Sequence, residues 1–260
     1  QRWQTSIQPD ATIALFKQKH ARSDIKEIFI HAIYLCNLGS PDPVIYEKSY
    51  NALKVALSLQ VKLGADGVIV HPGSHKGTDR KAGLQRIVRA TKQLLKEVPH
   101  ATLIFESSAG AGDTLGDTLD DLYYLVRECG QPQQVGICLD TCHLFASGID
   151  IRSDKSQENV IASLIKFDLL SSMRVIHLND SATPFASHRD LHADIGKGEI
   201  GIYALASFSS QPLFRQLAII LETPILKTIA SSVESHHGMY RSFFDGIRAG
   251  LRAGGLTKRK

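Results

Sequence analysis

Six short, β-rich segments of the chain each end on a histidine or an acidic residue, whose side chains could bind metal ions or transfer protons. Apolar runs such as V-G-I-C-L-D (Val135 to Asp140) are typical of buried strands. A single polar residue at a strand end usually faces water, but six in succession indicate a shared site. The six residues are His31, His71, Glu106, Asp140, His177 and Glu222.

The spacing of these residues predicts the fold. Successive members are separated by 40, 35, 34, 37 and 45 residues, which is enough for one strand, one helix and two loops. A strand that returns parallel to its neighbour needs such a crossover helix. In a (β/α)8 TIM barrel, the C-terminal strand ends converge on one face, where active sites are built. We therefore predict an α/β barrel in which the six side chains meet in one pocket.

The remaining elements follow from apolar periodicity and from turn signals. We predict helices at residues 10–22, 46–63, 79–98 and 233–249, and the last strand at residues 217–222. Six strands can be counted where a closed barrel has eight, so two strands are expected to be absent from this sequence. Residues 1–260 are predicted to form a single domain.

Composition restricts the compartment and the partners. Although 43% of the residues are hydrophobic, no apolar run approaches a membrane span and no signal peptide is recognisable, so a cytoplasmic protein is expected. The net charge of +4 permits an anionic partner without demanding one. The four cysteines contain no C-x-x-C pair, and a disulfide framework is not expected. A glycine-rich segment spaced G-x-G-x-x-x-G is one residue too long for a dinucleotide site.

Three further candidate ligands lie outside the strand ends. His143 is expected on the loop after Asp140, and Asp190 and His192 form a possible chelating pair in a long segment without periodicity. Loops of that length inside a compact domain are usually functional or disordered.

Five imidazoles and four carboxylates in one pocket would repel and desolvate one another unless cations neutralise them. Mixed nitrogen and oxygen ligands favour Zn²⁺, with Mn²⁺ or Fe as alternatives, and nine groups suit two or three ions. Closely spaced metals match the hydrolysis of a phosphate ester, because they lower the pKa of a bound water and clamp the phosphoryl oxygens.

Collinear segments from about Ile30 to Glu222 closely resemble the signature segments of the endonuclease IV family, the trinuclear-zinc apurinic/apyrimidinic endonucleases. They are H-P-G-S-H, E-S-S-A-G-A-G-D-T-L-G, G-I-C-L-D-T-C-H-L-F-A-S-G-I-D, H-L-N-D-S followed by R-D-L-H, and G-K-G-E-I-G. The resemblance implies three zinc ions. His31, His71 and Glu106 would hold the first. Glu106 would bridge to the second, held also by Asp140, His177 and Glu222, and the third would be held by His143, Asp190 and His192.

The resemblance also implies an activity. Family members cut duplex DNA 5′ to an abasic site by attack of a metal-bound hydroxide, leaving a 3′-hydroxyl and a 5′-deoxyribose phosphate, and Glu106 would be the catalytic bridging residue. The target nucleotide would be flipped out of the stack, which costs least where a base is already missing. Tyr34 and Leu35 match the family's DNA-contacting wedge. The implied partner is duplex DNA containing abasic sites, and we expect a monomer.

The sequence departs from the family pattern in two places. The family barrel begins with two strands that this sequence lacks, so we expect an N-terminally truncated chain. In I-H-A-I-Y-L, an apolar pair follows His31 where the family has a more polar one, which would alter the support of the first zinc.

Two other functions remain open at this point. One is a sugar isomerase or epimerase on a related barrel, with one divalent metal per chain. The other is an inactive zinc- or DNA-binding barrel, which would bind DNA in a strongly salt-dependent way without cutting it.

Overall fold

Six parallel strands form a curled sheet at the centre of the molecule. The computed structural model describes residue 3 and residues 8–225. The strand order is β1-β2-β3-β4-β5-β8, and every neighbouring pair is parallel. Over the described residues this is the architecture of a TIM barrel with two strands fewer than a closed one, as predicted. The bounds are Phe29–His31, Gly67–Val70, Leu103–Glu106, Val135–Asp140, Met173–His177 and Ala218–Ile220.

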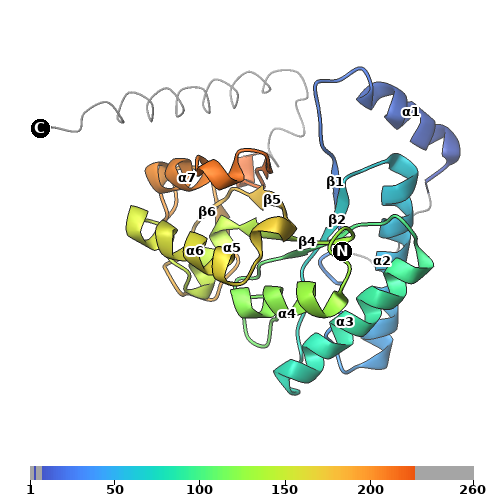
Figure 1. The fold of residues 1–260 in the computed structure, drawn as a ribbon, viewed down its shortest axis with the longest axis horizontal. Coiled ribbons are helices and arrows are strands. Elements are labelled where there is room, and N and C mark those ends of the chain that lie inside the picture. The colour runs from blue at the N-terminus through green and yellow to red at the C-terminus, as the bar shows by residue number, and fades with distance from the viewer. Residues whose placement is uncertain (1–2, 4–7, 226–260) are drawn as a thin grey trace, which may run out of the picture.

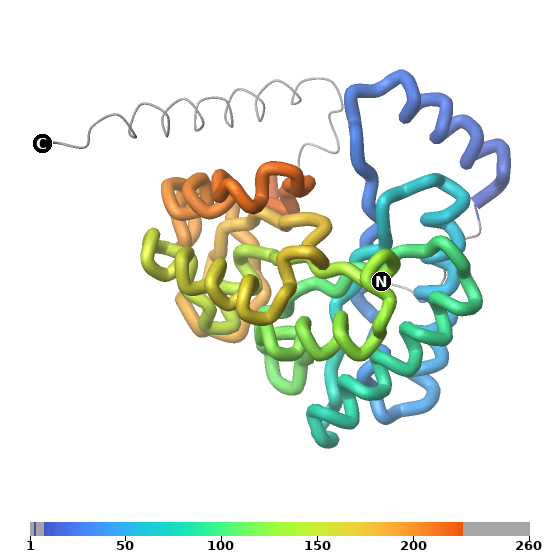
Figure 2. The backbone as a smooth tube through the Cα atoms, viewed as in Figure 1, coloured from blue at the N-terminus to red at the C-terminus, as the bar shows by residue number. Residues whose placement is uncertain are grey.

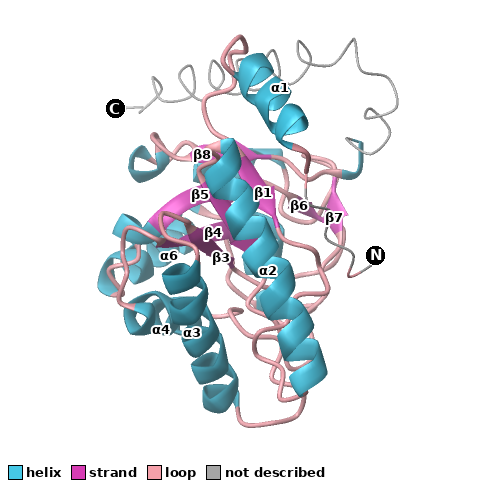
Figure 3. Cartoon of the chain, turned by 90° about the vertical axis from the view of Figure 1, so that its right-hand side faces the viewer, coloured by secondary structure: helices cyan, strands magenta, loops and turns pink. Residues whose placement is uncertain are grey.

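Helices follow the strands and cover the outer face of the sheet (Figure 1). Figure 3 shows α2, α3 and α4 beside one another on this face, and α1 packs on α2. The chain runs from α1 through these helices to α6 and α7 at the other end of the molecule (Figure 2). The bounds are Asp10–His20 for α1, Pro43–Leu63 for α2, Arg80–Glu97 for α3, Leu119–Cys129 for α4, Asp154–Lys166 for α6 and Ile202–Ser209 for α7.

Three shorter elements and two 3-10 turns complete the described part of the chain. The helix α5 (Thr141–Ser147) follows β4 directly, and the strands β6 (Asp180–Ser181) and β7 (His192–Ala193) pair with each other in an antiparallel manner. The 3-10 turns are Leu170–Ser172 and Pro212–Phe214.

Local capping signals set the helix ends. Asp42 caps α2 by accepting hydrogen bonds from the amides of Val44 and Ile45, so this helix begins three residues before the predicted position. Gly64, in the left-handed conformation, ends the same helix. The predicted helix at 79–98 is confirmed to within one residue at each end, with Asp79 as its cap. The predicted helix at 233–249 lies outside the described residues.

The central strands are buried on both faces, which is why they appear in the sequence as nearly continuous apolar runs. On the inner face, Ile69, Ile104, Cys138 and Val175 form a compact layer beneath the C-terminal strand ends. Within residues 8–225 no strand pairs with the outer edges of β1 and β8, so the edge residue Ile220 is only partly buried. The last strand is therefore shorter than the predicted 217–222.

The cysteine prediction is confirmed, since all four are free and buried. In the described part of the chain, no helix combines the length and the apolar character that a bilayer-spanning helix requires.

Candidate metal centre

The six strand-end residues lie along one edge of the sheet. Four of them end β1, β3, β4 and β5, one follows β2 directly, and one lies two residues beyond β8. The parallel register places Asp140 directly beside His177. The structure therefore shows the predicted convergence of the six strand-end residues, His31, His71, Glu106, Asp140, His177 and Glu222. The three further candidates, His143, Asp190 and His192, join the same cluster at ion-pair distances of 4.0 Å or less.

Glu106 lies at the centre of the cluster and is fully buried. Its Oε2 atom lies 2.9 Å from His31 Nε2 and 3.6 Å from His71 Nε2. Its other oxygen, Oε1, lies 2.9 Å from His177 Nδ1. Burial opposes the charged carboxylate, but the imidazoles of His71 and His177 outweigh it and hold the pKa of Glu106 well below its usual value. The two oxygens of one anionic carboxylate thus face two different sets of histidines.

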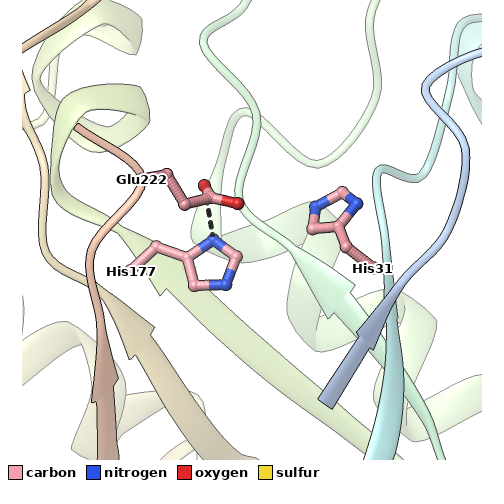
Figure 4. A group of neighbouring side chains, drawn as sticks. All are labelled: His31, His177 and Glu222. Atoms are coloured by element: carbon pink, nitrogen blue, oxygen red, sulfur yellow. Dashed lines mark ion pairs between the residues drawn. The ribbon is translucent and has the colours of Figure 1, made fainter. Parts of the chain in front are cut away.

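A second group surrounds His177. Its Nδ1 atom lies 3.1 Å from Glu222 Oε2 and 4.0 Å from Asp140 Oδ2. Figure 4 shows His177 and Glu222 pointing toward each other, with His31 facing them from β1 on the opposite side. Ligand atoms of these three residues lie within 4.8 Å of one another, which is close enough to share an ion.

A third group consists of His143, Asp190 and His192. Asp190 Oδ1 lies 3.1 Å from His143 Nε2 and 3.3 Å from His192 Nε2. Burial alone would lower the pKa of His143, but Asp140, Asp190 and Glu106 hold that pKa well above its usual value. This group is partly open to solvent, because the side chain of Asp190 is 39% exposed.

Backbone carbonyls fix the orientation of the histidine rings. A carbonyl can only accept a hydrogen bond, so Nδ1 of His31 donates to the carbonyl of Ala32 and Nδ1 of His143 donates to that of Ser107. In the neutral imidazole that binds a metal, each ring then has its unprotonated nitrogen at Nε2. The Nε2 atoms of His143 and His192 are buried and, although Asp190 Oδ1 lies 3.1 and 3.3 Å away, neither makes a well-aligned hydrogen bond within the described residues. The donor set and these two unpartnered nitrogens fit bound divalent cations.

The structure corrects two predictions about local environment. His143 lies on the helix α5 and not on a loop, because the Asp140 carboxylate caps this helix by accepting the amide of His143. The long segment after His177 is partly ordered by the strands β6 and β7, and His192 is the first residue of β7. Cys138 and Cys142 are buried on either side of Asp140.

Asn179 is a functional candidate that the residue types did not point to. Its Nδ2 donates to Asp140 Oδ2 at 2.6 Å, and its Oδ1 accepts the amide of Glu222 at 2.8 Å. One buried side chain thus positions two candidate ligands from β4 and from the segment after β8. The motif H-L-N-D-S contains this residue, and its place two residues after His177 was the available signal.

The structure also explains the G-K-G-E-I-G motif, which binds the side chain of Asp180 in this region. Both oxygens of the buried Asp180 accept backbone amides of this motif, from Gly196, Gly198, Ile200 and Gly201. A Cβ on Gly198 would lie 2.3 Å from the carbonyl oxygen of Ser181, so no other residue fits there without movement. The motif folds the chain back against β6 and supports the β6–β7 pair.

The predicted DNA-contacting residues lie at the mouth of the cluster. Tyr34 is 67% exposed, and its ring centroid lies 6.1 Å from that of His71. Leu35 is half-buried and lines a cavity of about 430 Å³ next to His71 and His143. Their position is compatible with contact to a bound substrate.

Comparison with known proteins places the chain in a family. The profile of the xylose isomerase-like TIM barrel family matches residues 3–240. A probable endonuclease 4 of Halothermothrix orenii is 35% identical over 223 residues, covering 85% of this chain and 80% of that protein. Another, of a Sulfurihydrogenibium species, is 37% identical over 211 residues, 80% of this chain and 75% of that protein. The chain belongs to the endonuclease IV family.

Solved structures agree with membership in the endonuclease IV family. Endonuclease IV from Thermus thermophilus matches with a TM-score of 0.79 at 29% identity, over 97% of this chain and 86% of that one. A D-tagatose 3-epimerase-like protein matches with a TM-score of 0.69 at 16% identity, over 93% and 85% of the two chains, and shares the fold alone. The predicted TIM barrel and the predicted endonuclease IV resemblance are both confirmed.

Proposed function

We propose that this endonuclease IV family member hydrolyses the phosphodiester bond 5′ to an abasic site in duplex DNA, leaving a 3′-hydroxyl and a 5′-deoxyribose phosphate. The observation that carries the proposal is the convergence of nine ligand-type side chains in three groups, with the two oxygens of Glu106 facing different histidines. A single-metal isomerase has no need of the third group around Asp190.

The chain supplies a complete ligand set for three zinc ions. Glu106 would be shared between the first two ions, and its lowered pKa keeps it anionic at neutral pH. When bound, the ions would supply Lewis acidity that neutralises phosphoryl charge and activates water. The assigned sets are His31, His71 and Glu106 for the first ion, Glu106, Asp140, His177 and Glu222 for the second, and His143, Asp190 and His192 for the third.

The other residues of the centre position these ligands and the substrate. Asn179 holds the Asp140 carboxylate and the Glu222 backbone in a fixed relation. The carbonyls of Ala32 and Ser107 set the ring orientations of His31 and His143. The exposed ring of Tyr34, with Leu35 behind it, would fill the space in the base stack from which the abasic nucleotide is withdrawn.

The test combines strand cutting with metal analysis. A duplex carrying one tetrahydrofuran abasic analogue is incubated with metal-replete protein, and the products are resolved by length and end group. We expect a nick 5′ to the analogue with a 3′-hydroxyl, and about three zinc ions per chain. Intact strands would contradict the proposal, and about one ion per chain would favour the isomerase alternative.

A further inference from the structure

A lysine lines the cleft beside the candidate metal centre. Two cavities of about 430 and 710 Å³ open over the cluster and share Tyr34, His71, His143 and Asp190 among their lining residues. Of the described residues that line either cavity, Lys76 is the one lysine or arginine. A cleft that receives a polyanion therefore has a single lysine or arginine on its described walls.

The backbone at Lys76 is held in an unfavourable conformation. Its φ of +49° lies in the left-handed region that few residues other than glycine, asparagine and aspartate adopt. The Lys76 amide donates to Ser74 Oγ, the Ser74 amide donates to Asn37 Oδ1, and Ser74 forms a β-bridge with Thr114. Strained positions that the surrounding structure enforces gather at functional sites.

The ammonium group of Lys76 is free to meet a ligand. The residue is exposed, and its side chain makes no ion pair or hydrogen bond with any residue in the described part of the chain. Asp190, an acidic residue lining the same cavity, is already within 3.3 Å of two histidines. A lysine in such a place binds a phosphate as a point charge.

We propose that Lys76 binds a backbone phosphate of the DNA strand that carries the abasic site, next to the scissile phosphate, and so holds that strand in the cleft. The inference rests on the proposed function and adds to it a residue outside the metal ligand set. The contact exists both before and during cleavage, so its loss appears mainly in KM and much less in kcat.

The experiment compares charge-removing and charge-keeping variants at this position. Lys76→Met keeps the length of the side chain and removes the charge, and Lys76→Arg keeps the charge. Lys96→Ala is the matched control, since Lys96 is also exposed but lies in the last turn of α3, away from the strand ends. Affinity for the abasic duplex is measured by fluorescence anisotropy at several salt concentrations, together with KM and kcat.

We expect Lys76→Met to bind about tenfold more weakly at low salt, with a corresponding rise in KM. The slope of log K against log salt should fall in magnitude by about 0.9, the value for one lost phosphate contact. Lys76→Arg should recover most of the affinity, and Lys96→Ala should match the wild type in affinity and in slope.

A glycine variant separates the effect of the side-chain charge on binding from the effect of the backbone conformation. Lys76→Gly relieves the backbone strain, so the fold is retained while binding falls as in Lys76→Met. Wild-type affinity in Lys76→Gly would overturn the role of Lys76. Equal affinities and slopes for Lys76→Met and Lys96→Ala would do the same, provided that the wild-type protein cleaves the abasic duplex. Either result would leave the proposed function standing. A wild-type protein that neither binds nor cuts the duplex would instead refute the proposed function.

Discussion

Glu106 and Asp190 are chemically similar members of the candidate metal centre, but the fold holds them in different ways. The Glu106 carboxylate lies 2.9 Å from both His31 and His177. The Asp190 carboxylate lies 3.1 Å from His143 and 3.3 Å from His192. Glu106 ends a central strand and is fully buried, whereas the Asp190 side chain is 39% exposed and precedes a two-residue strand.

The difference separates an inner part of the centre from an outer part. The inner part is built on strands that cannot move without disturbing the core, because packed interiors respond strongly to small changes of shape. The outer part depends on the β6–β7 pair and on solvent-exposed connections, which open at lower free energy. The same chemical change should therefore have unequal consequences in the two parts.

The largest effect is expected from Glu106→Gln, which removes the charge between the first two ligand groups. We expect kcat on the abasic duplex to fall by at least roughly 10³-fold, since a preorganised charge at the reacting centre is lost. Binding of the duplex should stay measurable by anisotropy. Wild-type turnover in this variant would exclude a bridging role for Glu106.

The matched change in the outer part is Asp190→Asn. We expect a smaller loss, of about 10²-fold in kcat, together with the loss of about one metal ion per chain in elemental analysis. The ions of the inner part should be retained, because Asp190 is not among their proposed ligands and lies outside the central strands. If this variant lost all of its metal, the separation of the two parts would be wrong.

Asn179→Ala tests the inner part without removing a ligand. Asp140 and the Glu222 backbone both lose a buried hydrogen bond, so metal affinity should fall by about 10- to 100-fold. The free energy of unfolding should fall by about 1–3 kcal/mol in a denaturant titration. Asn159→Ala, at an exposed position on α6, is the control and should change neither quantity.

Acidification should weaken the whole centre and release the outer ion first, because its ligands depend on the β6–β7 pair, which opens at lower free energy than the central sheet. Burial opposes protonation of His143 and His192, but nearby carboxylates raise the pKa of both above the ordinary 6.5. In the inner part, burial also opposes protonation of His31 and His177, but Glu106 raises the pKa of His31, Cys138 and Glu106 raise that of His177, and burial lowers the pKa of His71. Because a cation needs the neutral imidazole, affinity falls as the pH drops below each histidine's pKa, by about tenfold per pH unit.

Elemental analysis after dialysis at stepped pH values provides the measurement. The outer ion should be lost as the pH falls toward and through 6.5, before the ions of the inner part. Asp190→Asn should lack this first step, and simultaneous release of all ions would contradict the distinction between the two parts.

The sequence was sufficient to locate the candidate ligands at the strand ends, for a physical reason. Alternating strands and crossover helices of regular length bring the C-terminal strand ends to one edge, so local patterns located His31, His71, Glu106, Asp140 and His177. The strand β4 has the predicted bounds because all six of its residues are buried and the first five are apolar. The sixth, Asp140, caps the helix that follows.

Only the tertiary structure determined how the candidate ligands are held. The helix α5 has seven residues and the strands β6 and β7 have two each, too few for a period to be visible in the sequence. Asn179 acts on Asp140 across a separation of 39 residues, and the Asn37 side chain fixes the turn that carries Lys76 across 37. Contacts between such distant residues depend on the register of neighbouring strands and on side-chain packing. Local residue patterns predict the strands themselves, but these contacts exist only once the sheet has formed.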